Sequence, residues 1–183
     1  MRVIAGSARG IKLETLEGLD TRPTTDRVKE AVFSMIHPNI GGAVCLDLFS
    51  GSGSLGIELL SRGAKSVTFV EGNHQLKSII ISNLNKTKLM DQATLLFQDV
   101  YRSIEMLSGK KFDLILMDPP YLKGDIRKSL DLIAKYNLLN ENGLVIAEHD
   151  ILDTDILPCS AYFESLKTKK YGKIGVTVFR RLL

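Results

Sequence analysis

The sequence has no run of about 18 apolar residues, so it offers no candidate for a helix that crosses a membrane. Residues 1–7 reach charged and glycine positions at once and lack the apolar stretch of a signal peptide. Cysteine is scarce, and the wide separation of Cys45 and Cys159 favours free thiols over a disulfide framework. Repeats and low-complexity tracts are also lacking. We therefore expect a protein of the reducing cytoplasm, and its 183 residues fit one domain.

The net charge of +3, from 24 Lys and Arg against 21 Asp and Glu, is too small to indicate a partner. Its distribution is uneven, because residues 1–40 sum to +1, residues 41–166 to −4 and residues 167–183 to +6. A basic tail on an acidic body favours a polyanionic partner. A solvated, lysine-rich hairpin is the simpler alternative.

From about residue 43, short apolar runs rich in β-forming residues alternate with segments of helical length. This alternation predicts right-handed βαβ crossovers, and hence an α/β fold with a mostly parallel, doubly wound sheet. Two further β-rich runs flank a short turn at 171–173 and predict a closing antiparallel pair. The expected strands are 44–49, 66–70, 93–97, 112–117, 144–147, 162–170 and 174–180, and the expected helices are 54–62, 73–87, 100–107 and 126–136.

Residues 1–40 are expected to form a small extension that packs on the main domain, 41–183. A β-hairpin turning at 6–10 is predicted for residues 1–13. Thr24 is the expected N-cap of a helix that carries Asp26 in its first turn. Apolar residues at 28, 31, 32, 35 and 36 then follow helical spacing, so one face of this helix should pack on the body.

A glycine-rich loop stands where the first expected strand ends and a helix begins. Gly51, Gly53 and Gly56 satisfy G-x-G-x-x-G, a spacing that lets the backbone approach a ligand and offers helix N–H groups to an anion. Asp47 lies just ahead of the turn and would repel the pyrophosphate of a dinucleotide. A zwitterion fits better, with its carboxylate on the N–H groups and its ammonium near Asp47. S-adenosylmethionine ends in such an amino acid, although a tight turn with a stray carboxylate is the alternative.

Two further acidic residues follow the next strands. Glu71 ends the second strand, 20 residues after Gly51, where a carboxylate binds ribose hydroxyls in this type of fold. Asp99 follows the third strand and is placed to accept a hydrogen bond from the exocyclic amine of adenine. Each has a simpler alternative role as a helix cap. Neither residue separates S-adenosylmethionine from a nicotinamide dinucleotide.

The sequence Asp-Pro-Pro-Tyr at 118–121 follows the fourth strand, at the edge where open α/β sheets bind ligands. Two successive prolines fix a rigid loop, which aims the Asp118 carboxylate and the Pro119 carbonyl at one point. Two acceptors that grip the hydrogens of an exocyclic amine would expose its lone pair to a sulfonium methyl group. Pro120 adds rigidity, and Tyr121 is placed to stack on a base rotated out of its surroundings. An ordinary rigid loop or a proline-rich ligand is the alternative.

With these motifs in place, residues 47–53 and 118–121 resemble motifs I and IV of amino-methyltransferases that use S-adenosylmethionine. Residues 1–7, 22–30, 60–64, 148–149 and 171–172 narrow the match, and nearly the whole chain resembles the RsmD family. The resemblance implies a Rossmann-like methyltransferase fold with seven strands, the last antiparallel. It also implies methyl transfer to the exocyclic N2 of one guanine in 16S ribosomal RNA, with S-adenosylhomocysteine as the second product.

The expected site combines the motifs with this resemblance. Asp118, Pro119, Pro120 and Tyr121 are the expected catalytic residues. The cofactor contacts are expected to be Asp47, Phe49, Ser50, Gly51, Gly53, Glu71, Gly72, Asp99, Val100 and Asp118. Two departures from the family stand out, since Gly72-Asn73 replaces a frequent charged pair and Lys173-Ile174 replaces the usual Asp-Thr.

Basic residues in the tail and near the start suit contacts to RNA phosphates, which position a nucleic acid without reading its sequence. The candidates are Arg9, Arg22, Arg27, Lys169, Lys170 and Lys173. His37, His74 and His149 show no metal-ligand spacing with the cysteines, so no metal is expected. His149, expected just after the fifth strand, is placed to line the edge of the pocket, and a structural role is the simpler interpretation.

Three other functions compete with this hypothesis. A DNA adenine-N6 or cytosine-N4 methyltransferase also uses Asp-Pro-Pro-Tyr, but this chain has no room for a large target-recognition region. A non-catalytic RNA-binding or assembly module of the same fold is disfavoured by the intact Asp118 and glycines. Asp47 and the Pro-Pro loop disfavour a nicotinamide-dependent dehydrogenase. The expected partner is 16S ribosomal RNA or a small-subunit assembly intermediate, and the expected state is a monomer away from membranes.

Overall fold

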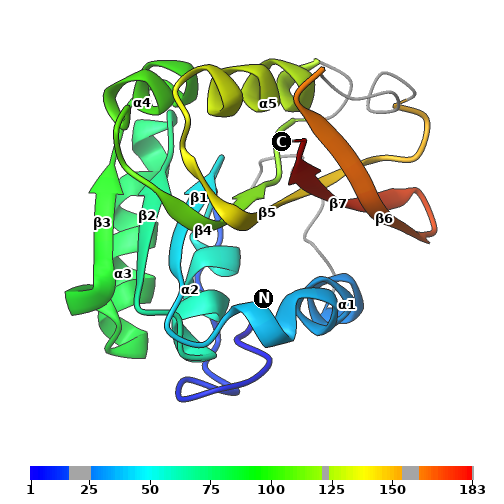
Figure 1. Ribbon diagram of the computed structural model, residues 1–183. Coiled ribbons are helices and arrows are strands. Elements are labelled where there is room, and N and C mark those ends of the chain that lie inside the picture. The colour runs from blue at the N-terminus through cyan, green and yellow to red at the C-terminus, as the bar shows by residue number, and fades with distance from the viewer. Residues whose placement is uncertain (17–25, 121–123, 154–160, 183) are drawn as a thin grey trace.

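In the computed structural model, which describes residues 1–16, 26–120, 124–153 and 161–182, a seven-stranded sheet forms the centre of the molecule (Figure 1). The strand order is β3-β2-β1-β4-β5-β7-β6. The five strands from β3 to β5 are parallel, and β7 is antiparallel to both of its neighbours. The predicted fold class and the closing antiparallel pair are confirmed. The strands are β1 (Val44–Leu48), β2 (Ser66–Val70), β3 (Ala93–Leu96), β4 (Phe112–Met117), β5 (Leu139–Asp150), β6 (Phe163–Tyr171) and β7 (Ile174–Arg181).

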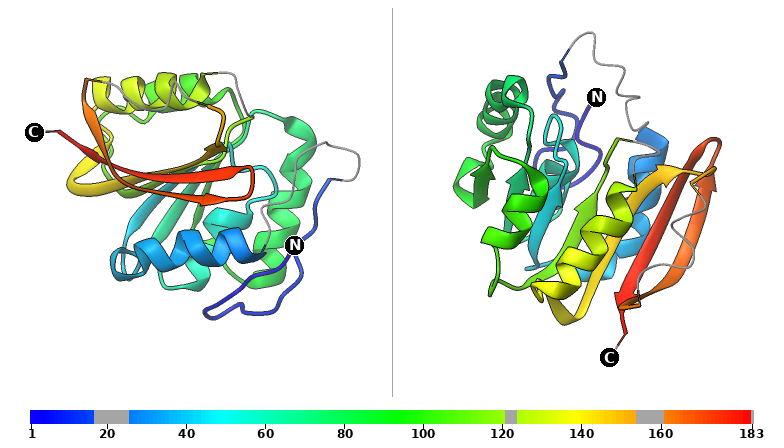
Figure 2. Two further views of the ribbon diagram at one scale, coloured as in Figure 1. Left: turned by 90° about the vertical axis from the view of Figure 1, so that its right-hand side faces the viewer. Right: turned by 90° about the horizontal axis from the view of Figure 1, so that it is seen from above.

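Helices cover both faces of the sheet, and a hydrophobic core lies under each layer (Figure 2). One layer holds α1 (Asp26–Ile36), α2 (Ser54–Ser61) and α3 (Lys77–Thr87), and the other holds α4 (Val100–Met106) and α5 (Asp125–Lys135). Single turns of 3₁₀ helix are η1 (His37–Asn39), η2 (His74–Leu76) and η3 (Met90–Gln92). Within the described ranges, every helix is too short or too polar to cross a bilayer.

Strand β5 is much longer than the predicted 144–147. Its first residues include Asn140, Glu141 and Asn142, which carry no β signal, yet Leu139 pairs with Phe112 of β4. Its last residues are polar, but Glu148 to Asp150 continue the ladder with β7. Neighbouring strands rather than local propensity therefore set its length. As a result His149 lies inside β5, and the prediction that it follows the strand is wrong.

The N-terminal segment is less regular than a β-hairpin. Its two limbs exchange backbone hydrogen bonds, such as Val3 N–H to the Ile11 carbonyl at 3.0 Å, but the one β-bridge outside the named strands in the described ranges joins Arg2 and Lys12. The turn instead packs on α2, because a Cβ at Gly6 would lie 1.7 Å from the Ser61 carbonyl oxygen. The hairpin prediction holds only in outline. The predicted cap, Thr24, lies outside the described residues, while Asp26 starts α1 as expected.

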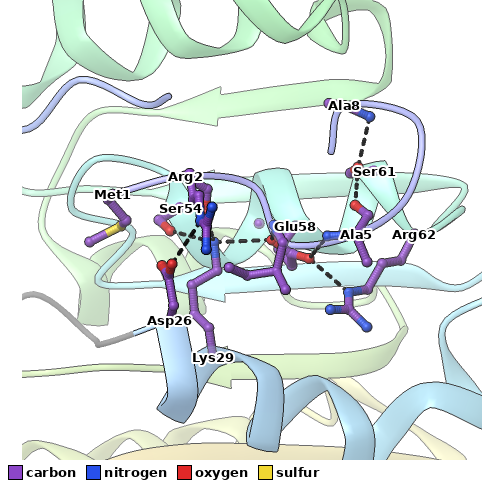
Figure 3. A network of polar contacts seen from close by, with 12 residues as sticks. Met1, Arg2, Ala5, Ala8, Asp26, Lys29, Ser54, Glu58, Ser61 and Arg62 are labelled. Carbon is purple, nitrogen blue, oxygen red and sulfur yellow. Dashed lines mark hydrogen bonds and ion pairs between the residues drawn. The ribbon is translucent and has the colours of Figure 1, made fainter. Parts of the chain in front are cut away.

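A buried ion pair joins this segment to α1 and α2 (Figure 3). Lys29 and Glu58 are both fully buried, with 3.1 Å between Nζ and Oε2. The carboxylate of Glu58 also accepts hydrogen bonds from two backbone N–H groups, at residues 4 and 5, and from Arg62 Nε. Burial lowers the pKa of Lys29, and the Glu58 charge opposes that shift. Several donors thus compensate a charge that would be costly to bury alone.

Candidate cofactor and substrate site

The predicted cofactor loop lies between β1 and α2 and has an unusual backbone. Phe49, Gly51 and Gly53 all adopt positive φ, at 61°, 57° and 80°. Such a conformation is easy for glycine but costs a bulky residue such as Phe49 about 1 kcal/mol or more. The chain therefore doubles back sharply at the carboxyl end of β1. Gly53 is the N-cap of α2, so the helix begins directly after the turn.

Asp47 is buried beneath this loop, with 1% of its surface exposed. Its Oδ2 accepts a hydrogen bond of 2.9 Å from Gly56 N–H in the first turn of α2. Burial raises the pKa of Asp47 to about 7, and the charge of Glu71 adds to the rise, while bonds to Gly56 and Ser50 oppose it. A Cβ at Gly56 would lie 2.2 Å from the Phe69 ring, which explains the glycine there. A nearby cation such as an ammonium group would favour the ionised carboxylate.

Ser50 ties the loop to β2. Its hydroxyl donates to the Asp47 carbonyl oxygen at 2.8 Å and accepts from Val70 N–H at 3.0 Å. Two buried side chains hold the loop from the other side. Asn83 Nδ2 donates to the Ser52 carbonyl at 2.9 Å, and Lys29 Nζ donates to Ser54 Oγ at 3.0 Å. The sequence motifs did not predict these two contacts, because Asn83 lies on α3 and Lys29 on α1, far from the loop in sequence.

Glu71, which the spacing predicts to bind ribose hydroxyls, lies against the loop with its oxygens engaged with backbone. Oε2 accepts from Gly51 N–H and Oε1 accepts from Asn73 N–H, each at 2.7 Å. Asp99 is exposed and caps α4 by accepting from Arg102 N–H at 3.0 Å, the alternative noted above. The loops after β2 and β3 are close together, since a Cβ at Gly72 would lie 4.0 Å from the Asp99 Cα. Their roles in cofactor binding stay predictions.

The predicted catalytic loop begins beside the predicted cofactor loop. Strand β4 lies between β1 and β5, and Met117 pairs with Leu48 on one side and Ala147 on the other. Asp118, the next residue, therefore stands between the turn at Phe49 and the end of β5. Pro119 is buried and Pro120 is exposed, while the fourth member of the motif, Tyr121, lies outside the described residues.

A small hollow of about 10 Å³, room for one water molecule, opens next to this loop. Its lining residues are Pro119, Pro120, Gly124, Asp125, Ile126, Glu148, His149 and Asp153. His149 forms part of its wall and is held in place, with 2.9 Å between Nε2 and Thr177 Oγ1. In the sequence analysis, Glu148 contributed to the family resemblance, but no role in the site was predicted for it. The sequence did hold one signal for a role of Glu148, because this acidic residue directly follows the apolar run 144–147 of an expected strand.

A contact between Tyr101 and Asp125 connects α4, which follows β3, to α5, which follows the predicted catalytic loop. The Tyr101 hydroxyl, from the first turn of α4, donates to Asp125 at the start of α5. Burial raises the pKa of Tyr101, and the bond to Asp125 adds to the rise. Lys128 Nζ lies 3.5 Å from the centre of the Tyr101 ring, a cation–π distance. The bond thus ties down the start of α5, although no motif contained Tyr101.

The basic hairpin of β6 and β7 reaches the same edge of the sheet. Asp150 of β5 pairs with Ile174, and Ile151 N–H donates to the Lys173 carbonyl at 3.1 Å. Lys169, Lys170 and Lys173 are exposed there. Their charges therefore lie near the carboxyl end of β5.

The other predicted RNA contacts are more scattered. Arg9 is exposed next to Ala8, whose N–H donates to Ser61 Oγ at the far end of α2, about 12 Å from the loop by helix rise. Arg27 is exposed on α1, and Arg22 lies outside the described residues. The structure thus brings the lysines near the carboxyl ends of β4 and β5 but leaves Arg9 away from them. Within the described ranges, no group of three His, Cys, Asp or Glu side chains is arranged to hold a metal ion.

The sheet order, the antiparallel β7 and the loop between β1 and α2 define the class of this protein: a Rossmann-like methyltransferase fold. The family described as "Conserved hypothetical protein 95", the RsmD family, matches residues 1–180. The chain therefore belongs to the RsmD family.

Individual relatives agree with this assignment. A Bacillus subtilis protein named as a candidate rRNA methyltransferase is 37% identical over 183 residues, 99% of each chain. The ribosomal RNA small subunit methyltransferase D of Haemophilus influenzae is 38% identical over 81% of this chain and 78% of its own. A solved Escherichia coli structure, described as a candidate methyltransferase, is 30% identical with a TM-score of 0.88, covering 99% of this chain and 97% of that one.

Proposed function

We propose that this protein transfers a methyl group from S-adenosylmethionine to the exocyclic N2 of a guanine in 16S ribosomal RNA. The observation that carries the proposal is the position of Asp118 directly between the cofactor loop and the end of β5. The named methyltransferase relatives support the reaction class and ribosomal RNA as the substrate. The choice of N2 rests on the resemblance and on the amine-binding chemistry of the Asp-Pro-Pro loop.

The residues at the loop fit the cofactor. The N-terminus of α2 suits the carboxylate of a bound amino acid, and the buried Asp47 suits its ammonium. Glu71 and Asp99, on adjacent loops, suit ribose hydroxyls and the adenine amine. When bound, S-adenosylmethionine supplies an electrophilic methyl group on a sulfonium.

The chain's own residues would prepare the amine. A guanine N2 is a weak nucleophile because its lone pair is delocalised into the ring. Acceptance of its two hydrogens by the Asp118 carboxylate and the Pro119 carbonyl favours a pyramidal nitrogen and frees the lone pair. Nitrogen then forms a bond to the methyl carbon as the carbon–sulfur bond breaks and leaves its electron pair on sulfur. One N2 proton leaves through its hydrogen bond to the Asp118 carboxylate and passes on to solvent. The proline pair holds the acceptors rigidly, so the catalytic effect comes from orientation and electrostatics.

Radiolabelled S-adenosylmethionine offered with naked 16S RNA, assembled small subunits and duplex DNA tests the proposal. We expect label in RNA, recovered as N2-methylguanosine after nuclease digestion. Asp118→Ala should lower turnover by at least about 100-fold while largely sparing affinity for S-adenosylhomocysteine. Asp131→Ala, at an exposed position of α5, is the control. Label confined to DNA would overturn the proposal, and an equal loss of cofactor affinity in Asp118→Ala would place Asp118 in the cofactor pocket instead.

A further inference from the structure

Glu148 is a buried carboxylate at the carboxyl end of β5, with 3% of its surface exposed. The pairing of Met117 with Ala147 places the next residues of the two strands, Asp118 and Glu148, at neighbouring positions. Neighbouring strands lie about 4.8 Å apart, so the backbones of these two acidic residues are adjacent at this edge. Glu148 also lines the hollow beside Pro119. It is therefore an acceptor next to the place where the target amine would be held.

The backbone around Glu148 is fixed by its neighbours. The His149 ring is bonded to Thr177 at 2.9 Å through Nε2 and lies 2.9 Å from the Asp150 carbonyl through Nδ1. A Cβ at Gly175 would come within 2.3 Å of this ring, so glycine is what leaves room for it. Glu148 itself makes an interaction within the chain. A carboxylate has about four acceptor positions, so an internal contact leaves capacity for a ligand donor.

The edge of guanine next to N2 has a distinctive pattern. Guanine carries a hydrogen on N1 beside the N2 amine, so two neighbouring groups donate. Adenine and 2-aminopurine have a lone pair on N1, which a carboxylate would repel. Enzymes that rotate a base out of its stack read this edge through hydrogen bonds. A site that presents a second carboxylate beside the amine acceptor therefore suits guanine and disfavours both other bases.

We propose that Glu148 selects guanine by accepting a hydrogen bond from N1–H while Asp118 and Pro119 hold the N2 amine. The inference rests on the proposed function and adds a specificity-determining residue to it. The hollow is too small to enclose a base, so the guanine edge would lie at its mouth. Selection then comes from one fixed acceptor rather than from the shape of a deep pocket. A site built to bond a substrate N–H strongly rejects an analogue that lacks it.

The test replaces the methylated guanosine, once mapped, by 2-aminopurine in a ligated 16S RNA. This base keeps the exocyclic amine but lacks the N1 hydrogen and the 6-oxo group, so the comparison between the wild type and a Glu148 variant is what isolates the N1 contact. We expect the wild type to prefer guanine in kcat/KM by about 100-fold. Glu148→Gln can donate from its amide to the N1 lone pair, so the preference should fall below about 10-fold. Glu141→Gln, exposed on the same strand, is the matched control and should keep the full preference.

The possible results separate the two proposals. Absence of N2-methylguanosine from wild-type reactions would remove the proposed function itself. Formation of that product with equal use of 2-aminopurine by the wild type would overturn the role of Glu148 alone, and this measurement needs no variant to fold. An unchanged guanine preference in a folded Glu148→Gln protein would overturn it as well. Affinity for S-adenosylhomocysteine, measured by calorimetry, should stay within about 3-fold in this variant, because the residue faces substrate rather than cofactor.

Discussion

Replacing Asp47 with asparagine should change how the stability of the protein depends on pH. The carboxyl group is 1% exposed, and burial raises its pKa to about 7. In the unfolded chain an aspartate titrates near 3.9. Between these values the folded protein keeps a proton that the unfolded chain has lost. The substituted amide would not titrate, yet its oxygen could still accept the hydrogen bond from Gly56 N–H.

The direction and the size of this change in stability with pH follow from the linkage between proton binding and folding. Because the folded state binds more protons between pH 4 and pH 7, the free energy of unfolding of the wild type falls as pH rises through that window. A shift of about three pKa units corresponds to about 4 kcal/mol, reached at pH 7 and constant above it. The asparagine variant escapes this penalty. Its stability relative to the wild type should therefore increase by about 4 kcal/mol from pH 4 to pH 7.5.

Urea unfolding at half-unit pH steps measures this difference, with Asp91→Asn at an exposed position as the control. A difference that stays constant across the range would refute the reasoning, because it would mean that Asp47 is ionised in the folded protein at all these pH values. Calorimetry supplies a second measurement. If the ligand ammonium approaches Asp47, binding of S-adenosylhomocysteine near pH 6.5 should release a proton, visible as a dependence of the binding enthalpy on the buffer.

Two further predictions concern the buried ion pair and the basic hairpin. Glu58→Ala should lower the free energy of unfolding in urea by about 3–5 kcal/mol, because it leaves a buried cation and several hydrogen-bond donors without their acceptor. Lys29→Met should lower it by only about 1–3 kcal/mol, because the Glu58 carboxylate keeps its other donors. A larger loss for Lys29→Met would contradict this order. Replacing both Lys169 and Lys170 by alanine should reduce the slope of log Kd for RNA against log salt by about 1.4, because each lost phosphate contact removes about 0.7. The slope is measured between 50 and 200 mM salt. Lys86→Ala, exposed on α3, is the control, and an unchanged slope in the double variant would remove β6 from the RNA interface.

The alternation of apolar and helical segments predicted the sheet well because each buried strand has a continuous apolar run. Strand β4 was predicted to the residue, at Phe112–Met117. The predicted bounds are wrong where contacts with other parts of the fold, rather than the local sequence, determine the secondary structure. The first part of β5 is polar and is a strand because it pairs with β4, and its last part is a strand because β7 lies alongside. The N-terminal hairpin is irregular for the same reason, since Glu58 takes two of its backbone N–H groups.

The candidate site was predictable where chemistry depends on local spacing. The sequence places the glycines, Asp47 and Glu71 at one turn, and the structure brings them together there because the turn after the first strand has a fixed geometry. The side chains that hold that turn could not be predicted, because Lys29 and Asn83 approach it from other helices. Glu148 shows the limit most clearly. Its sequence neighbours indicate a strand end, but only the pairing of β4 with β5 places it beside Asp118.

Under the proposed function, Asp47 and Glu71 would both hold the loop and bind the cofactor, and this affects how any variant of them is interpreted. Each carboxylate accepts a hydrogen bond from the loop backbone, at Gly56 and Gly51 respectively, so each holds the turn before any cofactor is present. A loop ordered in advance lowers the entropic cost of binding. Under the proposed function, loss of affinity in a Glu71 variant would therefore combine a missing ribose acceptor with a loosened turn. The Asp47→Asn variant keeps the acceptor for Gly56 but removes the charge, so it separates these two duties where a truncation to alanine would merge them.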